Sequence, residues 1–138
     1  MTFLLDTNAC IQIMRYPRGS VAERFFDTPA VQMGISIITL AELMVGPNRK
    51  NSRPEEHDKV KRILAKLRVL PFDEKCADEF ARIGAYLLDI GAPSAGLDMQ
   101  IAATARVQDL TVVTHNTKHF VNIPQLRLED WQVPAASN

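Results

Sequence analysis

The sequence predicts an α/β fold in which a central parallel sheet of about five strands is flanked by helices on both faces. Two observations support this prediction. Short apolar runs alternate along the chain with longer segments in which apolar residues recur every three or four positions. The chain has 138 residues, 46% of them hydrophobic and 23% charged, which is ordinary for one globular domain.

Five apolar runs are the candidate strands, and they lie at residues 2–5, 31–36, 69–72, 110–114 and 126–128. Helical periodicity occupies the intervals between them. From Pro54 to Arg68 the apolar face is formed by Val60, Ile63, Leu64 and Leu67. In the next interval it is formed by Cys76, Phe80, Ile83, Gly84 and Leu87. Gly91 and Pro93 end this second helix, and residues 17–19 divide an earlier helix in two.

We expect one domain at residues 1–132 and a disordered tail at residues 133–138, because no repeat or linker divides the chain. No apolar run approaches the ~20 residues of a membrane span, and the N-terminus lacks the pattern of a signal peptide. Cys10 and Cys76 stand 66 positions apart, with no second cysteine near either. This spacing indicates neither a thiolate zinc site nor a disulfide framework, and it favours a reduced, cytoplasmic setting.

Charge is unevenly distributed although the formal net charge is zero. Residues 49–68 carry eight of the sixteen basic residues against three acids, a local charge of +5. Two interpretations stay open. The segment is either a solvated helix face with ion pairs four residues apart or a surface that attracts phosphate groups.

Three acidic residues follow or begin elements at comparable places. Asp6 comes directly after the apolar run at 3–5, where a parallel strand presents its carboxyl end to a ligand. Glu42 lies early in the helix that follows the run at 31–36, and Asp98 lies in the opening turn of the helical segment 96–105. The carboxyl ends of parallel strands share one edge, so we expect the three carboxylates to meet there.

Each acid also has a structural explanation. Asp6 or Asn8 could cap the next helix. Thr39 and Glu42 have the S/T-x-x-E spacing of a capping box, and Asp98 could interact only with a helix dipole. Three carboxylates at one edge would nevertheless repel one another unless a cation neutralised them. Without a nearby His or Cys, the expected cation is a hard one, Mg²⁺ with Mn²⁺ as a substitute.

A polar loop follows the fourth candidate strand on the same edge. Asn116 is the residue there that we expect to support the acids, by adding a neutral oxygen or orienting a water. His115 and His119 are candidates of lower rank, since a histidine in a loop is more often a surface residue. His57 is expected to be solvated.

Four motifs in this order resemble the PIN-domain nucleases, and the VapC toxins among them. They are Leu-Asp-Thr-Asn at 5–8, Thr-Leu-Ala-Glu-Leu at 39–43, Leu-Asp-Met-Gln-Ile-Ala-Ala at 97–103 and Thr-His-Asn-Thr-Lys-His-Phe at 114–120. The resemblance covers essentially the whole chain. It implies a PIN-like domain in which Asp6, Glu42 and Asp98 are catalytic, metal-binding acids and Asn116 supports them.

The resemblance also implies a function and partners. The protein would be a metal-dependent endoribonuclease that cuts a tRNA or rRNA loop as the toxin of a type II toxin–antitoxin system. It would form a homodimer, assemble with a VapB-like antitoxin, and meet operator DNA only through that antitoxin. One position departs from the family, which often has a fourth acid where this chain has His119. Coordination of a second metal is therefore in question.

Two alternatives belong to other functional classes. A PIN-like module could bind RNA or protein without cutting, which the change at His119 would suit. An aspartyl-phosphate phosphotransfer enzyme could use a similar acidic edge. Against the latter, Asn8 stands where a dehalogenase-like site needs a second Asp, and Asp73 with Lys118 fits a receiver domain badly.

Overall fold

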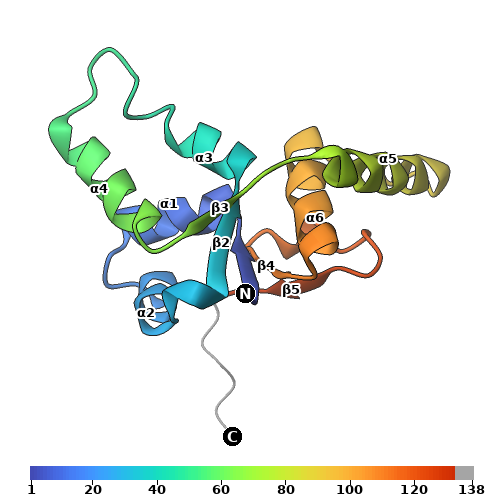
Figure 1. The fold of residues 1–138 in the computed structure, drawn as a ribbon, viewed down its shortest axis with the longest axis horizontal. Coiled ribbons are helices and arrows are strands. Elements are labelled where there is room, and N and C mark those ends of the chain that lie inside the picture. The colour runs from blue at the N-terminus through green and yellow to red at the C-terminus, as the bar shows by residue number, and fades with distance from the viewer. Residues whose placement is uncertain (133–138) are drawn as a thin grey trace, which may run out of the picture.

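A computed structural model describes residues 1–132 and contains a five-stranded sheet in the order β3-β2-β1-β4-β5 (Figure 1). All four strand pairings are parallel. The strands are β1 (Phe3–Leu5), β2 (Met33–Ser36), β3 (Arg68–Leu70), β4 (Thr111–Val113) and β5 (Arg127–Glu129). All five predicted strands are confirmed, with boundaries that move by at most two residues. The predicted disordered tail at 133–138 lies outside the described residues.

Six α-helices connect the strands in this part of the chain. They are α1 (Thr7–Arg15), α2 (Ser20–Asp27), α3 (Ile37–Leu43), α4 (Pro54–Leu64), α5 (Glu74–Asp89) and α6 (Gly96–Gln108). Two short 3₁₀ turns, η1 (Ala30–Gln32) and η2 (Thr117–His119), precede β2 and follow β4. The first of them replaces the beginning of the strand predicted at 31–36.

The sheet separates two hydrophobic cores because side chains alternate along each strand. Leu5 and Val113 belong to the core under α1, α2, α3 and α4, whereas Leu4 and Val112 belong to the core under α5 and α6. Figure 1 shows the two groups of helices on opposite sides of the strands. The prediction of helices on both faces is therefore confirmed.

The predicted helix ends are also present. Helix α5 ends in a Schellman motif, in which the Gly91 amide donates to the Leu88 carbonyl at 3.1 Å and the Ala92 amide to the Leu87 carbonyl at 2.9 Å. Gly91 has a φ of 71°, a left-handed conformation that favours glycine. The break at 17–19 separates α1 from α2. Among the described helices, none is both long and apolar enough to cross a membrane.

Strand order places a topological switch at the centre of the sheet. The chain builds β1, β2 and β3 in one direction and then returns to add β4 and β5 on the other side of β1. The switch point therefore lies between the carboxyl ends of β1 and β4. Ligands of open α/β sheets bind beyond the strand ends at such a point.

Candidate functional site

Asp6 stands at the switch, directly after β1. Its backbone amide donates to the Val113 carbonyl at 3.0 Å, which continues the pairing of β1 with β4 by one residue. Its carboxylate Oδ1 accepts the Ala9 amide at 2.7 Å and so caps helix α1. The capping role considered for this residue is thus confirmed. It leaves further acceptor positions on the carboxylate, which offers about four in all.

Burial makes Asp6 electrostatically unusual, since its side chain is 5% exposed. Desolvation raises the pKa of Asp6, and the nearby charges of Asp98 and Glu42 raise it further. Hydrogen bonds from the Thr114 side chain and the Ala9 amide act in the opposite direction. The net effect is a carboxylate whose charged form is disfavoured in the protein by itself.

Glu42 is held by a side chain from α1 rather than by a capping box. Thr7 Oγ1 donates to Glu42 Oε1 at 2.5 Å. The cap of α3 is Ser36, whose Oγ accepts the Thr39 amide at 3.1 Å. The capping-box interpretation is therefore wrong. Helix α3 starts three residues earlier than that interpretation requires, and Glu42 falls in its last turn.

Thr39 has a different part in this arrangement. It is fully buried, and its Oγ1 lies 3.2 Å from Thr7 Oγ1. A hydroxyl has one proton, so the proton that Thr7 donates to Glu42 leaves its oxygen free to accept from Thr39. The Thr39 and Thr7 hydroxyls and the Glu42 carboxylate thus form a hydrogen-bonded chain that fixes one oxygen of Glu42.

Asp98 lies in the first turn of α6, with 25% of its side chain exposed. Partial burial raises the pKa of Asp98, the charge of Glu42 raises it further, and His119 lowers it. The His119 Nδ1 is 3.5 Å from Asp98 Oδ2. This distance allows an electrostatic contact and is too long for a good hydrogen bond.

Asn116 reaches the site through its backbone. Its amide donates to Thr114 Oγ1 at 3.0 Å, and Thr114 in turn hydrogen-bonds Asp6. No hydrogen bond within residues 1–132 involves the Asn116 side chain. His115 contacts another part of the molecule, with its Nδ1 3.0 Å from Asp130 Oδ2.

Sequence reasoning missed two residues that organise the acids, Thr7 and Thr114. Thr114 directly follows the end of β4, and Thr7 lies two residues after the end of β1. A small hydroxyl side chain at such a place can reach a neighbouring carboxylate. That placement is the signal that could have identified them. Thr114 is fully buried, so its hydroxyl acts on Asp6 in a site of low polarity.

The three acids influence one another, and within residues 1–132 no ion pair involves Asp6 or Glu42. Only carboxylate oxygens are offered, and these are the ligands that hard divalent cations prefer. In the same part of the chain, no three His, Cys, Asp or Glu side chains approach closely enough to hold an ion alone. The donor set suits a partly hydrated ion, since Mg²⁺ usually keeps several waters and takes one or two carboxylates plus substrate phosphates.

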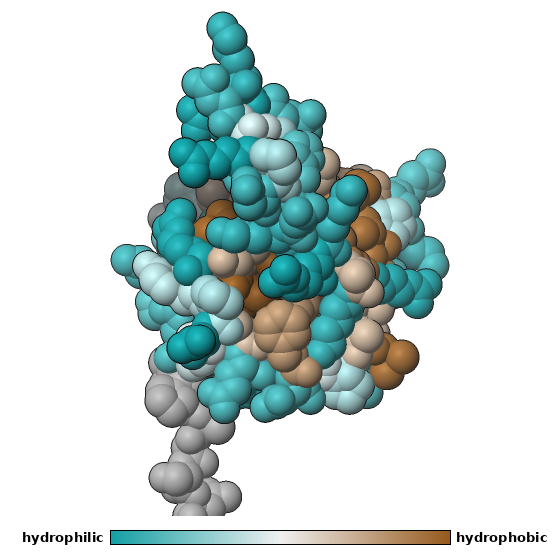
Figure 2. Space-filling model, turned by 90° about the vertical axis from the view of Figure 1, so that its left-hand side faces the viewer, coloured by the Kyte–Doolittle hydropathy of each residue, from teal (hydrophilic) through white to brown (hydrophobic). Residues whose placement is uncertain are grey.

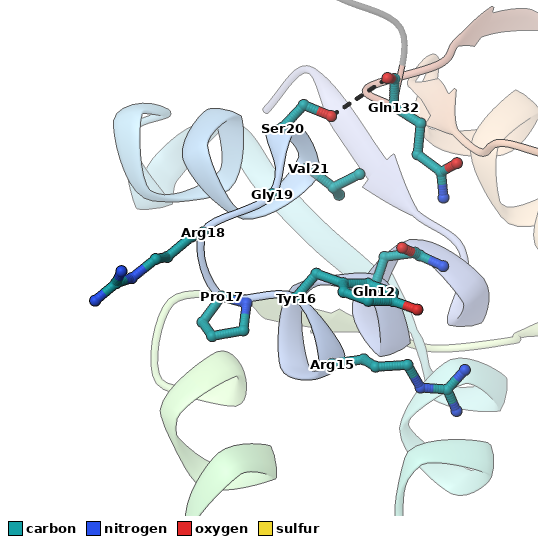
Figure 3. Close-up of a pocket in the computed structure, with 9 residues that line it drawn as sticks. All are labelled: Gln12, Arg15, Tyr16, Pro17, Arg18, Gly19, Ser20, Val21 and Gln132. Atoms are coloured by element: carbon teal, nitrogen blue, oxygen red, sulfur yellow. Dashed lines mark hydrogen bonds between the residues drawn. The ribbon is translucent and has the colours of Figure 1, made fainter.

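A separate cavity of about 540 Å³ lies at the other end of α1 (Figure 3). It is lined by residues of the α1–α2 turn and by Gln132, whose carbonyl accepts a hydrogen bond from Ser20 Oγ at 3.3 Å. None of the three acids lines it. Gln12, the first residue of α1 in this lining, is six residues beyond Asp6, roughly 9 Å along the helix. It is not part of the acidic site.

The basic segment 49–68 forms the α3–α4 connection, α4 and the beginning of β3. Figure 2, which views the side that carries α2 and α4, shows a mostly hydrophilic surface with hydrophobic side chains in its middle. Lys66 is occupied structurally, because its Nζ donates to the Phe26 carbonyl at 2.7 Å. Lys59 lines a cavity of about 290 Å³ that also contains Glu42. Within residues 1–132 no ion pair involves this segment, so the ion pairs four residues apart are absent, and attraction of phosphate groups stays a prediction.

Comparison with known proteins gives a consistent result. Residues 3–126 match the PIN domain family. The chain is 35% identical over 131 residues to the tRNA(fMet)-specific endonuclease VapC of Salmonella typhimurium, which covers 95% of this chain and 98% of that protein.

Two solved structures are similar over comparable lengths. The DNA-bound VapBC of Salmonella typhimurium has a TM-score of 0.87 and 35% identity, covering 95% of this chain and 98% of that one. VapBC2 of Rickettsia felis, bound to a DNA fragment from its promoter, has a TM-score of 0.86 and 29% identity, covering 95% and 99%.

Proposed function

Since this chain belongs to the PIN domain family, we propose that it is an endoribonuclease that acts as the toxin of a type II toxin–antitoxin system. The observation that carries the proposal is the acidic edge. Asp6 and Asp98 have raised pKa values, they lie near Glu42, and they lie at the switch point of the sheet. Desolvation and the neighbouring carboxylates oppose the ionised forms of Asp6 and Asp98, which a functional role explains and the capping of α1 by Asp6 does not.

Asp6, Asp98 and Glu42 are the proposed ligands of a divalent ion, Mg²⁺ with Mn²⁺ as a substitute. Such an ion supplies positive charge against the phosphate and lowers the pKa of water. Thr7 holds one oxygen of Glu42 and leaves the other for the ion or for the attacking water. Thr114 and Ala9 orient Asp6, and Asn116 supports this arrangement by donating its amide to Thr114.

The substrate proposed is a structured RNA, with a tRNA preferred because a relative at 35% identity is named a tRNA(fMet)-specific endonuclease. The proposed partners are a VapB-like antitoxin and a second copy of this chain. Operator DNA would be contacted through the antitoxin, as the DNA-bound complexes of two relatives suggest. The proposed location is the cytoplasm.

The test is digestion of tRNA by the purified chain with Mg²⁺ or Mn²⁺, compared with Asp6→Asn and with added EDTA. We expect fragments with a 5′ phosphate and a 3′ hydroxyl from the parent with metal, and none from Asp6→Asn or after addition of EDTA. Asp109→Asn is the matched control, because Asp109 is exposed and distant from the acids. Equal cutting by Asp6→Asn in the presence of EDTA would refute the mechanism.

A non-catalytic module is distinguished by a second measurement. The acidic edge should bind Mn²⁺, so Mn²⁺ should raise the melting temperature of the parent and not that of Asp6→Asn. A parent that neither cuts RNA nor responds to Mn²⁺ would be a binding module.

A further inference from the structure

A cavity of about 250 Å³ adjoins the acidic site on the side of α5 and α6, and Asp98 is part of its lining. The connection between α5 and α6 forms one wall, including Pro93, and η2 with the turn after it forms the other. Three polar side chains come from that second wall, Lys118, His119 and Asn122. At roughly 30 Å³ per water, the space equals about eight water molecules.

The lining combines charged side chains with a buried apolar surface. Leu87 and Ile123 contribute their apolar side chains and are 1% and 4% exposed. Lys118 is exposed, and no carboxylate within residues 1–132 lies at ion-pair distance from it. The His119 ring directs Nδ1 toward Asp98, which leaves its other ring nitrogen available. A cation, hydrogen-bonding edges and an apolar surface are the groups that recognise an RNA nucleotide.

The wall that carries these side chains is held in place before any ligand binds. Ser94 Oγ donates to the His119 carbonyl at 3.2 Å and joins the two walls. The His119 amide donates to the Asn116 carbonyl at 2.9 Å, and the Ile123 amide to the Phe120 carbonyl at 3.0 Å. Phe120 is 1% exposed and anchors the turn in the core. The lining is therefore pre-organised, which limits the entropy lost on binding.

The cavity on the other side of the acids differs in chemistry. Its four charged residues are two acids and two bases, Glu42, Glu56, Arg15 and Lys59. Much of its remaining lining is apolar, including Ile11, Met14 and Leu43. A base with its phosphate fits the polar cavity beside Asp98 better than this apolar one. The two cavities thus differ in which part of an RNA substrate they could bind beside the acids.

We propose that the cavity beside Asp98 binds the nucleotide next to the scissile phosphate, with Lys118 against the RNA backbone and Asn122 and His119 against the base or sugar. The proposal rests on the proposed nuclease function. It assigns Lys118 to affinity for the RNA backbone and Asn122 to nucleotide specificity, and neither residue takes part in the chemical step.

The experiment measures RNA binding and cutting separately for Lys118→Gln and Asn122→Ala. Lys75→Gln is the matched control, because Lys75 is an exposed lysine at the opposite end of α5. Binding is measured without divalent metal in the Asp6→Asn background, so that it does not depend on catalysis. Circular dichroism melting verifies that each variant is folded.

For Lys118→Gln we expect the Kd for the RNA to rise roughly five- to tenfold and the slope of log Kd against log salt to fall by about 0.7. For Asn122→Ala we expect a changed nucleotide preference at one position beside the cut, determined by sequencing fragment ends. Lys75→Gln should change neither.

Unchanged Kd, salt slope and cut-site preference in both variants would overturn the subsite. The nuclease proposal fails in a different way, if the parent does not cut RNA with Mg²⁺ or Mn²⁺. The two failures are distinguishable because RNA binding is measured in a variant that need not cut.

Discussion

Carboxylates at the two ends of the parallel sheet have opposite environments. At the amino end a cavity of about 490 Å³ is lined by Glu79, Arg106, Asp109 and Arg127. Each acid there faces an arginine, Glu79 with Arg106 at 3.0 Å and Asp109 with Arg127 at 3.0 Å. At the carboxyl end Asp6 and Glu42 have no such partner within residues 1–132, and Asp98 has only His119 at 3.5 Å.

This difference separates structural from functional charge. The amino-end pairs neutralise their own charge, so the fold is complete without a ligand. Burial and mutual repulsion at the carboxyl end raise the pKa of Asp6 and Asp98. A cation bound there would relieve this repulsion and stabilise the ionised carboxylates. Active sites commonly sacrifice stability in this way.

The largest expected difference between changes at the two ends of the sheet is in catalysis. Asp6→Asn should lower the rate of RNA cleavage at least about 100-fold, because loss of a metal ligand removes several kcal/mol of transition-state stabilisation. Initial rates under single-turnover conditions measure this. Asp109→Asn, an equivalent change at the amino end, should keep a cleavage rate within about twofold of the parent. A similar loss of rate in Asp109→Asn would show that the carboxylates at the two ends do not differ in function.

Removal of metal should lower the stability of the folded protein only through the carboxylates at the carboxyl end of the sheet. With Mg²⁺ at about 100 times its Kd, the folded parent should gain about 2.7 kcal/mol, and EDTA should abolish this gain. Thermal melts with and without Mg²⁺ measure it. Asp98→Asn should show little response, whereas Glu79→Gln should respond like the parent; an equal response in Asp98→Asn would exclude Asp98 as a ligand.

Breaking a pair at the amino end should cost stability without affecting chemistry. The Arg106 and Glu79 side chains are 16% and 25% exposed, and their contact is an ion pair rather than a well-directed hydrogen bond. Arg106→Ala leaves Glu79 partly buried and unpaired, and should lower the free energy of unfolding by roughly 2 kcal/mol.

Urea unfolding measures that change, and cleavage below the melting temperature should match the parent. The double variant Arg106→Met with Glu79→Leu should recover much of the loss, since it removes the unpaired charge. A cleavage defect in the folded Arg106→Ala protein would contradict the assignment of this end to structure alone.

The smallest effect concerns pH in the absence of metal. The pKa of Asp6 in the folded protein is raised, so its charged form opposes folding. Asp6→Asn should therefore be more stable than the parent at neutral pH. The difference should be absent below about pH 3.9, where the carboxyl is protonated in both states, and should grow as pH rises through the raised pKa.

Urea unfolding in EDTA across this pH range gives the difference directly. Asp109→Asn is again the comparison, because Asp109 is exposed and no increase in stability is expected from its neutralisation. A parent that is more stable than Asp6→Asn at neutral pH without metal would show that the attraction of the charged carboxylate to the amino end of α1 outweighs desolvation and repulsion.

The sequence predicted most of the fold and the location of Asp6 because those features are local. An apolar run that ends in an acid determines both the strand and the position of the acid at its carboxyl end. Gly91 predicted the end of α5 for the same reason, since few other residues adopt its φ of 71°. The environment of Glu42 did not follow from the sequence. Its spacing from Thr39 indicated a capping box, whereas the structure caps α3 with Ser36 at the end of β2.

What the sequence determined by itself is therefore the parallel sheet, its helices and the edge at which the acids lie. Only the tertiary structure decided which side chains meet. Thr7 reaches Glu42 across 35 positions, His115 pairs with Asp130 instead of the acids, and Lys118 faces a cavity whose other wall is 25 positions away at Pro93. Strands and helices are selected by neighbouring residues, whereas contacts between distant residues depend on how the whole chain packs.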